Sequence, residues 1–141
     1  MKRFHLDIMS PDRPFFSGEC VSAVIPLDDG AYGIMAGHEP LTAAVVPGEI
    51  SFQTPDGERI TCAVSQGMVS IGDEGVKILC ETVLLPDEID EEKERREAES
   101  AAENMKGQQS YRDFMLSQIT FARAISNLRV KKHDAALINH S

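Results

Sequence analysis

The amphipathic period of this 141-residue chain changes at Pro86 and Asp87, and this change constrains the fold more than any other feature. Before it, apolar and polar residues alternate in short runs, as they do in half-buried strands. After it, charged and apolar residues recur at helical spacing. The sequence therefore predicts a β-domain over residues 1–86 and a helical segment over residues 87–141.

The first segment consists of short strand-like runs that are separated by turn signals. Phe4, Leu6 and Ile8 alternate with polar neighbours, and Val21–Ile25 repeats the pattern after a predicted turn at Ser17–Gly18. Further runs occupy residues 41–46, 50–52, 60–64, 68–71 and 76–80, with turns at residues 47–48, 55–57 and 72–75. Strands of this length and spacing predict an antiparallel sandwich or barrel.

The second segment predicts two helices. Asp87 or Asp90 can cap the first helix, and Gly107 ends it. Ser110 can cap the second helix, which we expect to run through Val130 or slightly beyond. A loop this short indicates an antiparallel two-helix hairpin, so the fold class is α+β.

The first helix has little apolar surface, whereas the second carries an apolar stripe. The stripe comprises Tyr111, Phe114, Met115, Phe121, Ala122, Ile125 and Leu128. Such stripes are usually core, but the facing helix offers mainly alanines. We therefore expect part of the stripe to pack on the β-domain or on another protein, and we expect the hairpin to be able to detach.

Composition excludes several classes of protein. No run of about 18 apolar residues is present, and residues 1–10 lack the apolar middle of a signal peptide. We expect neither a signal peptide nor a transit sequence. We expect the protein to stay in the compartment where it is made. Cys20, Cys62 and Cys80 fit neither a disulfide framework nor a metal site, so they are predicted to be reduced core thiols.

The net charge of −9 is unevenly distributed. Residues 1–86 carry 12 acidic and 5 basic residues, residues 87–106 carry 9 and 4, and residues 107–141 carry 2 and 5. The acidic body argues against nucleic acid or anionic lipid as a partner. The basic final segment can instead meet an acidic protein surface.

One stretch, Gly30–Leu41, combines three glycines with Pro40 and His38. Glycine permits positive φ or close backbone approach, and proline restricts both itself and the residue before it. On spacing alone, this stretch is an ordered connection whose glycines serve turn geometry. His38 is then a half-exposed residue that stabilises the loop through a backbone hydrogen bond.

Several blocks together resemble the epsilon subunit of F-type ATP synthases. Residues 33–41 (GIMAGHEPL) are similar to that family's GI-x-x-GH-x-P-L signature. Phe4–Ser10 resembles its opening strand, Phe16–Gly18 its first turn, Val46–Gly48 its P-G turn and Ala122–Val130 its last helix. The blocks span nearly the whole chain in the family's order.

The resemblance implies a non-catalytic rotor subunit that couples proton flow to ATP synthesis. Its antiparallel β-sandwich would bind the gamma subunit and the ring of c subunits, with Gly33, Gly37, His38 and Pro40 near that ring. Membrane association would be indirect, through the complex, at the cytoplasmic face of a bacterial inner membrane.

The resemblance also implies that the helical hairpin can extend into the alpha/beta catalytic head and inhibit ATP hydrolysis. The basic residues that would contact the beta subunit are Arg123, Arg129, Lys131 and Lys132. Alternatively, these cations form a solvated basic face that complements the helix C-terminus.

Some members of the family bind ATP at the hairpin through I-D-x-x-R-A. Ile89 and Asp90 match this motif, but Lys93 replaces arginine and Glu94 replaces alanine. Lysine does not reproduce a bidentate guanidinium contact, and Glu94 would repel phosphate. Arg123 alone does not compensate, so the sequence argues against ATP as a ligand and implies no other cofactor.

The alternative function is an independent ligand-binding sandwich whose helices dimerise. Binding to gamma distinguishes the two hypotheses. An enzyme is a distant third, because the chain contains no metal cluster, nucleophile elbow or phosphate loop motif.

Overall fold

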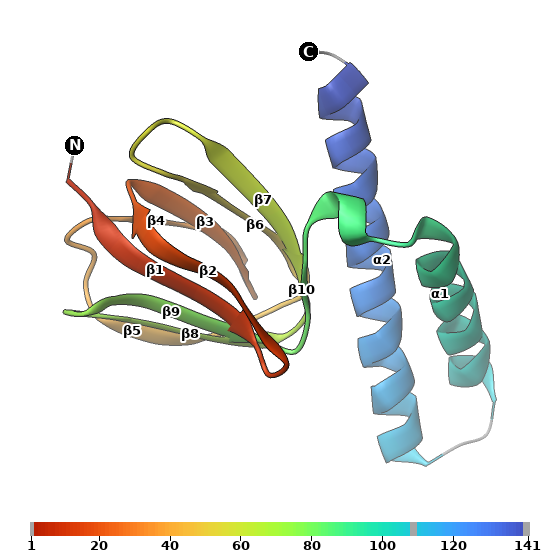
Figure 1. Ribbon diagram of the computed structural model, residues 1–141. Helices are drawn as coiled ribbons and strands as arrows, with labels where there is room; N and C mark the ends of the chain where they lie inside the picture. Colours follow the sequence, from red (N-terminus) through yellow and green to blue (C-terminus); the bar gives the residue numbers. More distant parts are fainter. Residues whose placement is uncertain (1, 108–109, 140–141) are drawn as a thin grey trace. The chain divides into compact units, whose positions relative to one another are not determined.

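The computed structural model describes residues 2–107 and 110–139, and these form two compact units that meet after Leu84 (Figure 1). The first unit consists of two five-stranded sheets, and the second contains a short 3-10 helix and two α-helices. The predicted fold class, a β-sandwich followed by a helical hairpin, is confirmed.

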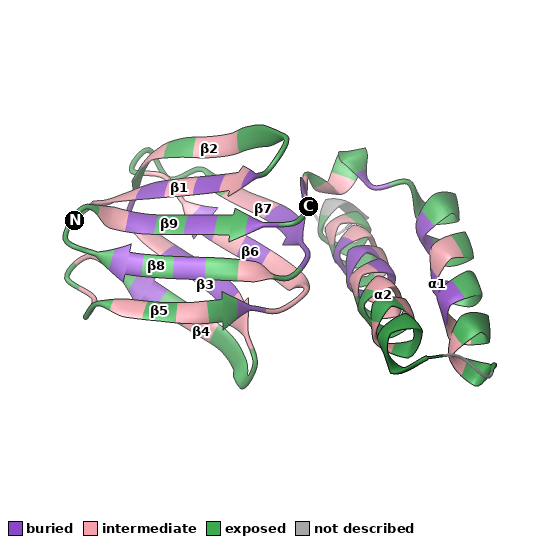
Figure 2. Ribbon diagram, turned by 90° about the horizontal axis from the view of Figure 1, so that it is seen from below, coloured by how far each residue is buried: buried purple, intermediate pink, exposed green. Residues whose placement is uncertain are grey.

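The first sheet has the strand order β2-β1-β9-β8-β5, and Figure 2 shows these strands side by side. The second sheet has the order β10-β7-β6-β3-β4. All neighbours are antiparallel except β1 and β9, which are parallel. The strands are β1 (Phe4–Ser10), β2 (Arg13–Cys20), β3 (Ser22–Leu27), β4 (Gly30–Met35), β5 (Leu41–Val45), β6 (Gly48–Gln53), β7 (Arg59–Val64), β8 (Gly67–Gly72), β9 (Gly75–Cys80) and β10 (Val83–Leu84).

The sandwich core is largely aliphatic, in a chain of which only 6% of the residues are aromatic. Alternate residues of each strand point inward, and one aromatic ring, that of Phe52, is fully buried among them. The three cysteines, Cys20, Cys62 and Cys80, are buried free thiols of this core. Every member of the core cluster lies between Leu6 and Val83.

The turn predicted at Ser17–Gly18 is wrong, because both residues belong to β2. Gly18 is paired with Leu6 of β1, and the chain reverses instead at Pro11 and Asp12. There the Ser10 hydroxyl donates to Asp12 Oδ1 over 2.8 Å. A proline followed by an aspartate that accepts this local hydrogen bond is the stronger turn signal.

The glycine-rich connection is shorter than predicted. Its first half forms β4, which is antiparallel to β3. The first partners in this pairing are Leu27 and Gly30, and the last are Ser22 and Met35. Only residues 36–40 connect β4 to β5. Alternation of small residues with Tyr32 and Ile34 explains why this half is a strand.

The second unit begins with the 3-10 helix η1 (Pro86–Glu88) and continues with α1 (Glu91–Lys106) and α2 (Tyr111–Asn139). Asp90, not Asp87, caps α1, because its Oδ1 accepts from the Lys93 amide over 3.1 Å. Ser110 Oγ accepts from the Asp113 amide in the same way at the start of α2. The second helix continues to Asn139, beyond the end expected near Val130.

The side of α2 that faces α1 is largely polar. Four residues of α2 line the groove between the helices, namely the apolar Leu116 and the polar Ser117, Thr120 and Arg123. At about 100° per residue, Phe114 and Ile125 lie roughly on the opposite side of α2 from Arg123. The apolar stripe is therefore not the surface that α1 covers.

Candidate functional site

The β4–β5 connection is built around one left-handed glycine. Gly37 has φ +84°, and the His38 amide donates to Met35 O over 3.2 Å, which closes the turn. Gly33 differs, since it lies in β4 without positive φ and has open space where a Cβ would stand. Pro40 is exposed at the end of the connection.

His38 is held between a side chain and a backbone carbonyl. Its Nδ1 lies 2.8 Å from Glu39 O, which can only accept, so we assign the ring proton to Nδ1. Nε2 then accepts from the Tyr32 hydroxyl over 2.7 Å, and the two rings meet edge to face. His38 is half-buried, and the hydrogen bond from its Nδ1 to the Glu39 carbonyl stabilises the loop.

A cleft of about 510 Å³ adjoins this loop at the end of the sandwich. Gly37 and His38 form one wall, and the β8–β9 turn with Asp73 and Glu74 forms another. His5 and Glu19 of the neighbouring strands also line it. The described side chains that line the cleft include three carboxylates (Glu19, Asp73 and Glu74) and one arginine (Arg3), so their charge disfavours an anionic phosphate.

Four outward-facing apolar residues cross the first sheet, one from each of four adjacent strands. The strand register places Met9 beside Leu79, Leu79 beside Met68, and Met68 beside Ala44. Met68 is 51% exposed and Leu79 is 48% exposed. We call this set, Met9, Leu79, Met68 and Ala44, the apolar row.

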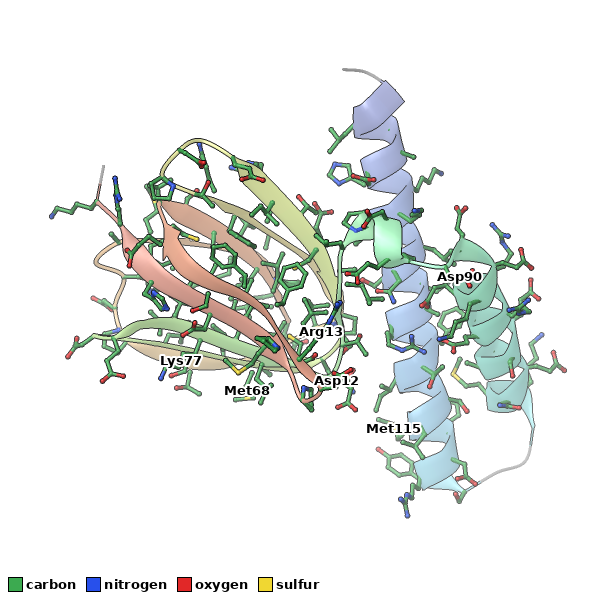
Figure 3. The ribbon with its side chains drawn as sticks, in the orientation of Figure 1. Asp12, Arg13, Met68, Lys77, Asp90 and Met115 are labelled. Atoms are coloured by element: carbon green, nitrogen blue, oxygen red, sulfur yellow. The ribbon has the colours of Figure 1, made fainter. Side chains whose placement is uncertain are left out.

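A polar row runs beside the apolar row on the same face. It includes Asp7, Lys77 and Ser70, which are consecutive partners across β1, β9 and β8. Figure 3 labels Lys77 of this polar row and Met68 of the apolar row. The Ser17 hydroxyl donates to Asp7 Oδ1 over 2.5 Å, and this hydrogen bond lowers the pKa of the carboxyl group. The face therefore offers an apolar strip with a charged edge.

The apolar row was not identified from the sequence, although a signal for it exists. Met9, Met68 and Leu79 stand at positions where the strand alternation calls for polar residues. Each exception is unremarkable alone. Only the register brings the three together, and register depends on pairing between strands that are distant in the sequence.

The four basic positions predicted to contact the beta subunit fall into two groups. Arg123 is held within the helical hairpin by Glu97 and Glu94 of α1, and Lys131 Nζ donates to Pro86 O over 3.0 Å. Arg129 and Lys132 are exposed.

The three positions considered for a nucleotide have structural roles here. Ile89 is buried, Asp90 caps α1, and the guanidinium of Arg123 contacts carboxylates. Glu94, which replaces the motif's alanine, is one of those carboxylates. The residues present therefore do not form a phosphate site.

The buried thiols are poor nucleophiles. Burial raises the pKa of Cys20 from 9.0 to about 11 and that of Cys80 to about 12, and burial raises the pKa of Cys62 further. A thiol with a raised pKa supplies almost no thiolate near neutral pH.

No helix among residues 2–107 and 110–139 is both long and apolar enough to cross a membrane.

Comparison with known proteins assigns the chain to a family. The family model described as ATP synthase, Delta/Epsilon chain, beta-sandwich domain matches residues 3–86. An ATP synthase epsilon chain from Ruminiclostridium cellulolyticum is 33% identical over 128 residues, which is 91% of this chain and 95% of that protein. Another, from Dichelobacter nodosus, is 38% identical over 102 residues, covering 72% of this chain and 71% of that protein.

A solved structure shares the fold across both units. A chain in the cryo-EM structure of the Euglena gracilis mitochondrial ATP synthase (OSCP/F1/c-ring, rotational state 1) matches with a TM-score of 0.75 and 21% identity. The match covers 96% of this chain and 81% of that chain. The ligand-binding alternative is set aside by the family match. The chain therefore belongs to the epsilon-subunit family of F-type ATP synthases, whose members are non-catalytic subunits of the complex.

Proposed function

We propose that the sandwich, residues 1–86, binds the gamma subunit and the c-subunit ring, and thereby couples proton flow to ATP synthesis. In this proposal the hairpin, residues 87–141, acts on the alpha/beta head and restrains ATP hydrolysis. The chain associates with the cytoplasmic face of a bacterial inner membrane through protein contacts alone. The bacterial sources of the relatives support this location.

The apolar row is the observation that carries the proposal for gamma. A contiguous exposed apolar strip on a rigid sheet, edged by charged residues, is typical of a protein interface. Met68 and Leu79 are long side chains that are about half exposed and can be buried by a partner. We expect gamma to cover this strip.

The β4–β5 connection, together with Gly33 of β4, is the surface that we assign to the c-subunit ring. Gly33 has no internal contact that requires glycine, so a side chain here would occupy space outside the sandwich. Met35 is 63% exposed beside it. The surface that we assign to the ring thus consists of Gly33, Gly37, His38 and Pro40. The hydrogen bonds of His38 to Tyr32 and to the Glu39 carbonyl hold the loop in this conformation.

Substitution within the apolar row tests the gamma interface. Met68→Asp places a charge where a partner would bury methionine, so we expect the affinity for gamma to fall at least tenfold, or about 1.4 kcal/mol. Val24→Asp is the matched control, because Val24 is an exposed strand residue (37%) of the other sheet. Equal affinities of the two variants for gamma would refute the assignment of this face.

A further inference from the structure

Two carboxylates of α1 hold the guanidinium of Arg123. Its Nη2 donates to Glu97 Oε2 over 2.5 Å, and its Nη1 lies 3.5 Å from Glu94 Oε2. Glu94 and Glu97 are one helical turn apart and therefore lie on the same face of α1. The contact thus joins both helices of the hairpin through three charged side chains.

The contact between Glu94 and Arg123 differs from a surface ion pair because the carboxylate is buried. Its side chain is 5% exposed, and within the described residues Oε2 has no hydrogen-bond partner. A buried carboxylate is tolerated when an opposite charge lies close to it. The guanidinium of Arg123 supplies that charge, so closing the hairpin buries Glu94 and engages Arg123 in a single step.

A guanidinium that is already bound by two carboxylates is not available to another acidic partner. Arg123 is 22% exposed, and its Nη1 and Nη2 lie 3.5 Å and 2.5 Å from carboxylate oxygens of α1. Arg129 and Lys132 are exposed, and Lys131 donates to the neutral carbonyl of Pro86. Among these four cations, Arg123 is therefore the one that α1 carboxylates hold.

We propose that Glu94 and Glu97 form a latch, an internal acidic ligand that keeps the hairpin closed and withholds Arg123 from the catalytic head. The latch and an acidic partner compete for the same guanidinium, so closed and partner-bound states are mutually exclusive. The carboxylates of Glu94 and Glu97 set the ratio of closed to partner-bound states, and no bound anion is needed. The part of the inference that concerns the head rests on the proposed function, whereas the part that concerns closure does not.

The latch is tested first on the full-length chain alone. Spin labels at Glu103→Cys and Gln118→Cys, both exposed positions, report the separation of α1 and α2. We expect Glu97→Gln to raise the ratio of separated to closed hairpins about tenfold, since it removes one charge-assisted hydrogen bond. The double variant with Glu94→Gln should open further.

Two controls separate the latch from general damage to the helix. Glu99→Gln removes the same charge from an exposed position of α1 and should leave the separation unchanged. Exchanging the charges, with Glu97→Arg and Arg123→Glu together, should restore closure relative to either single variant. An unchanged separation in Glu97→Gln, or an equal change in Glu99→Gln, overturns the latch.

Hydrolysis by the assembled head then tests the consequence. We expect Glu97→Gln to strengthen inhibition, and adding Arg123→Gln should abolish the increase. If the label separation changes while hydrolysis does not, the latch stands and the proposed contact with the head fails. If neither changes, the latch fails.

Discussion

Individual glycines determine how closely the strands of the first sheet can approach. Gly75 has φ +117°, and a Cβ there would collide with the carbonyl oxygen of His5. Gly72, at the other end of the same turn, has open space around its Cβ position and no positive φ. The two glycines of the β8–β9 turn therefore have different roles.

This difference gives a matched pair of substitutions. We expect Gly75→Ala to lower the free energy of unfolding by about 2–4 kcal/mol, because it combines backbone strain with a steric clash. Gly72→Ala should change the free energy by less than about 0.5 kcal/mol. Urea denaturation of both variants measures the two values, and similar losses would contradict the distinction.

The buried thiols make stability depend on alkaline pH. The pKa of Cys20 is raised to about 11 and that of Cys80 to about 12, from an ordinary 9.0. Their stabilising effect is complete below about pH 9, where the unfolded thiols begin to ionise. It is lost as the pH rises through the folded-state values. We expect the free energy of unfolding to fall above pH 9, and Cys80→Ala should have a smaller slope there.

Thiol accessibility gives an independent check at neutral pH. In the native protein at pH 7.5, we expect Cys20, Cys62 and Cys80 to react with a disulfide reagent at least about 100-fold more slowly than in denaturant, because they are buried and protonated. Rapid reaction of any one thiol in the folded protein would show that the core is open at that residue.

At the scale of elements, local patterns located most strands and the start of α2, and they left two candidates for the start of α1. Alternation predicted β1 and β3, and Ser110 was identified as the cap of α2. The failures occurred where two signals competed. Ser17–Gly18 has turn composition, but the ladder between β1 and β2 includes both residues.

The candidate sites were less predictable than the elements. Glu94 lies in the polar first half of α1, yet the residue is 3% exposed, because an arginine 29 positions later compensates its charge. The apolar row depends on strand register in the same way. Both features arise from pairing between distant segments, which local periodicity does not encode.

Two candidate caps for α1 can be separated by substitution. Asp90→Ala removes the side-chain acceptor of the Lys93 amide and should weaken the first turn of the helix by about 1 kcal/mol. Asp87→Ala changes the same charge within η1 without removing a cap. Amide hydrogen exchange of the Lys93 N–H should accelerate only in Asp90→Ala, and acceleration in both variants would reject the assignment.

At the scale of the whole molecule, the chain consists of two units with different kinds of stabilisation. The buried apolar cluster of the sandwich lies entirely between Leu6 and Val83. Among the described residues, the hairpin unit buries Ile89, Val130 and three alanines, and the charged contacts of Arg123 join its two helices. A unit with so little apolar contact between its helices can open at a lower free energy than the sandwich.

Truncation tests this division. We expect a chain that ends at Pro86 to retain a cooperative β-sheet unfolding transition, because no core cluster residue is removed. Circular dichroism should show loss of the helical signal with little change in the β-sheet signal. A truncated chain that is unfolded would contradict the division at this point.

Hydrolysis of ATP by the cognate epsilon-free head, which contains gamma, is the most direct test of the account. The full chain and residues 1–86 are added separately, and co-elution with the head is measured alongside turnover. We predict that both chains co-elute and that only the full chain slows hydrolysis. Failure of both chains to bind, or equal inhibition by both, would contradict it.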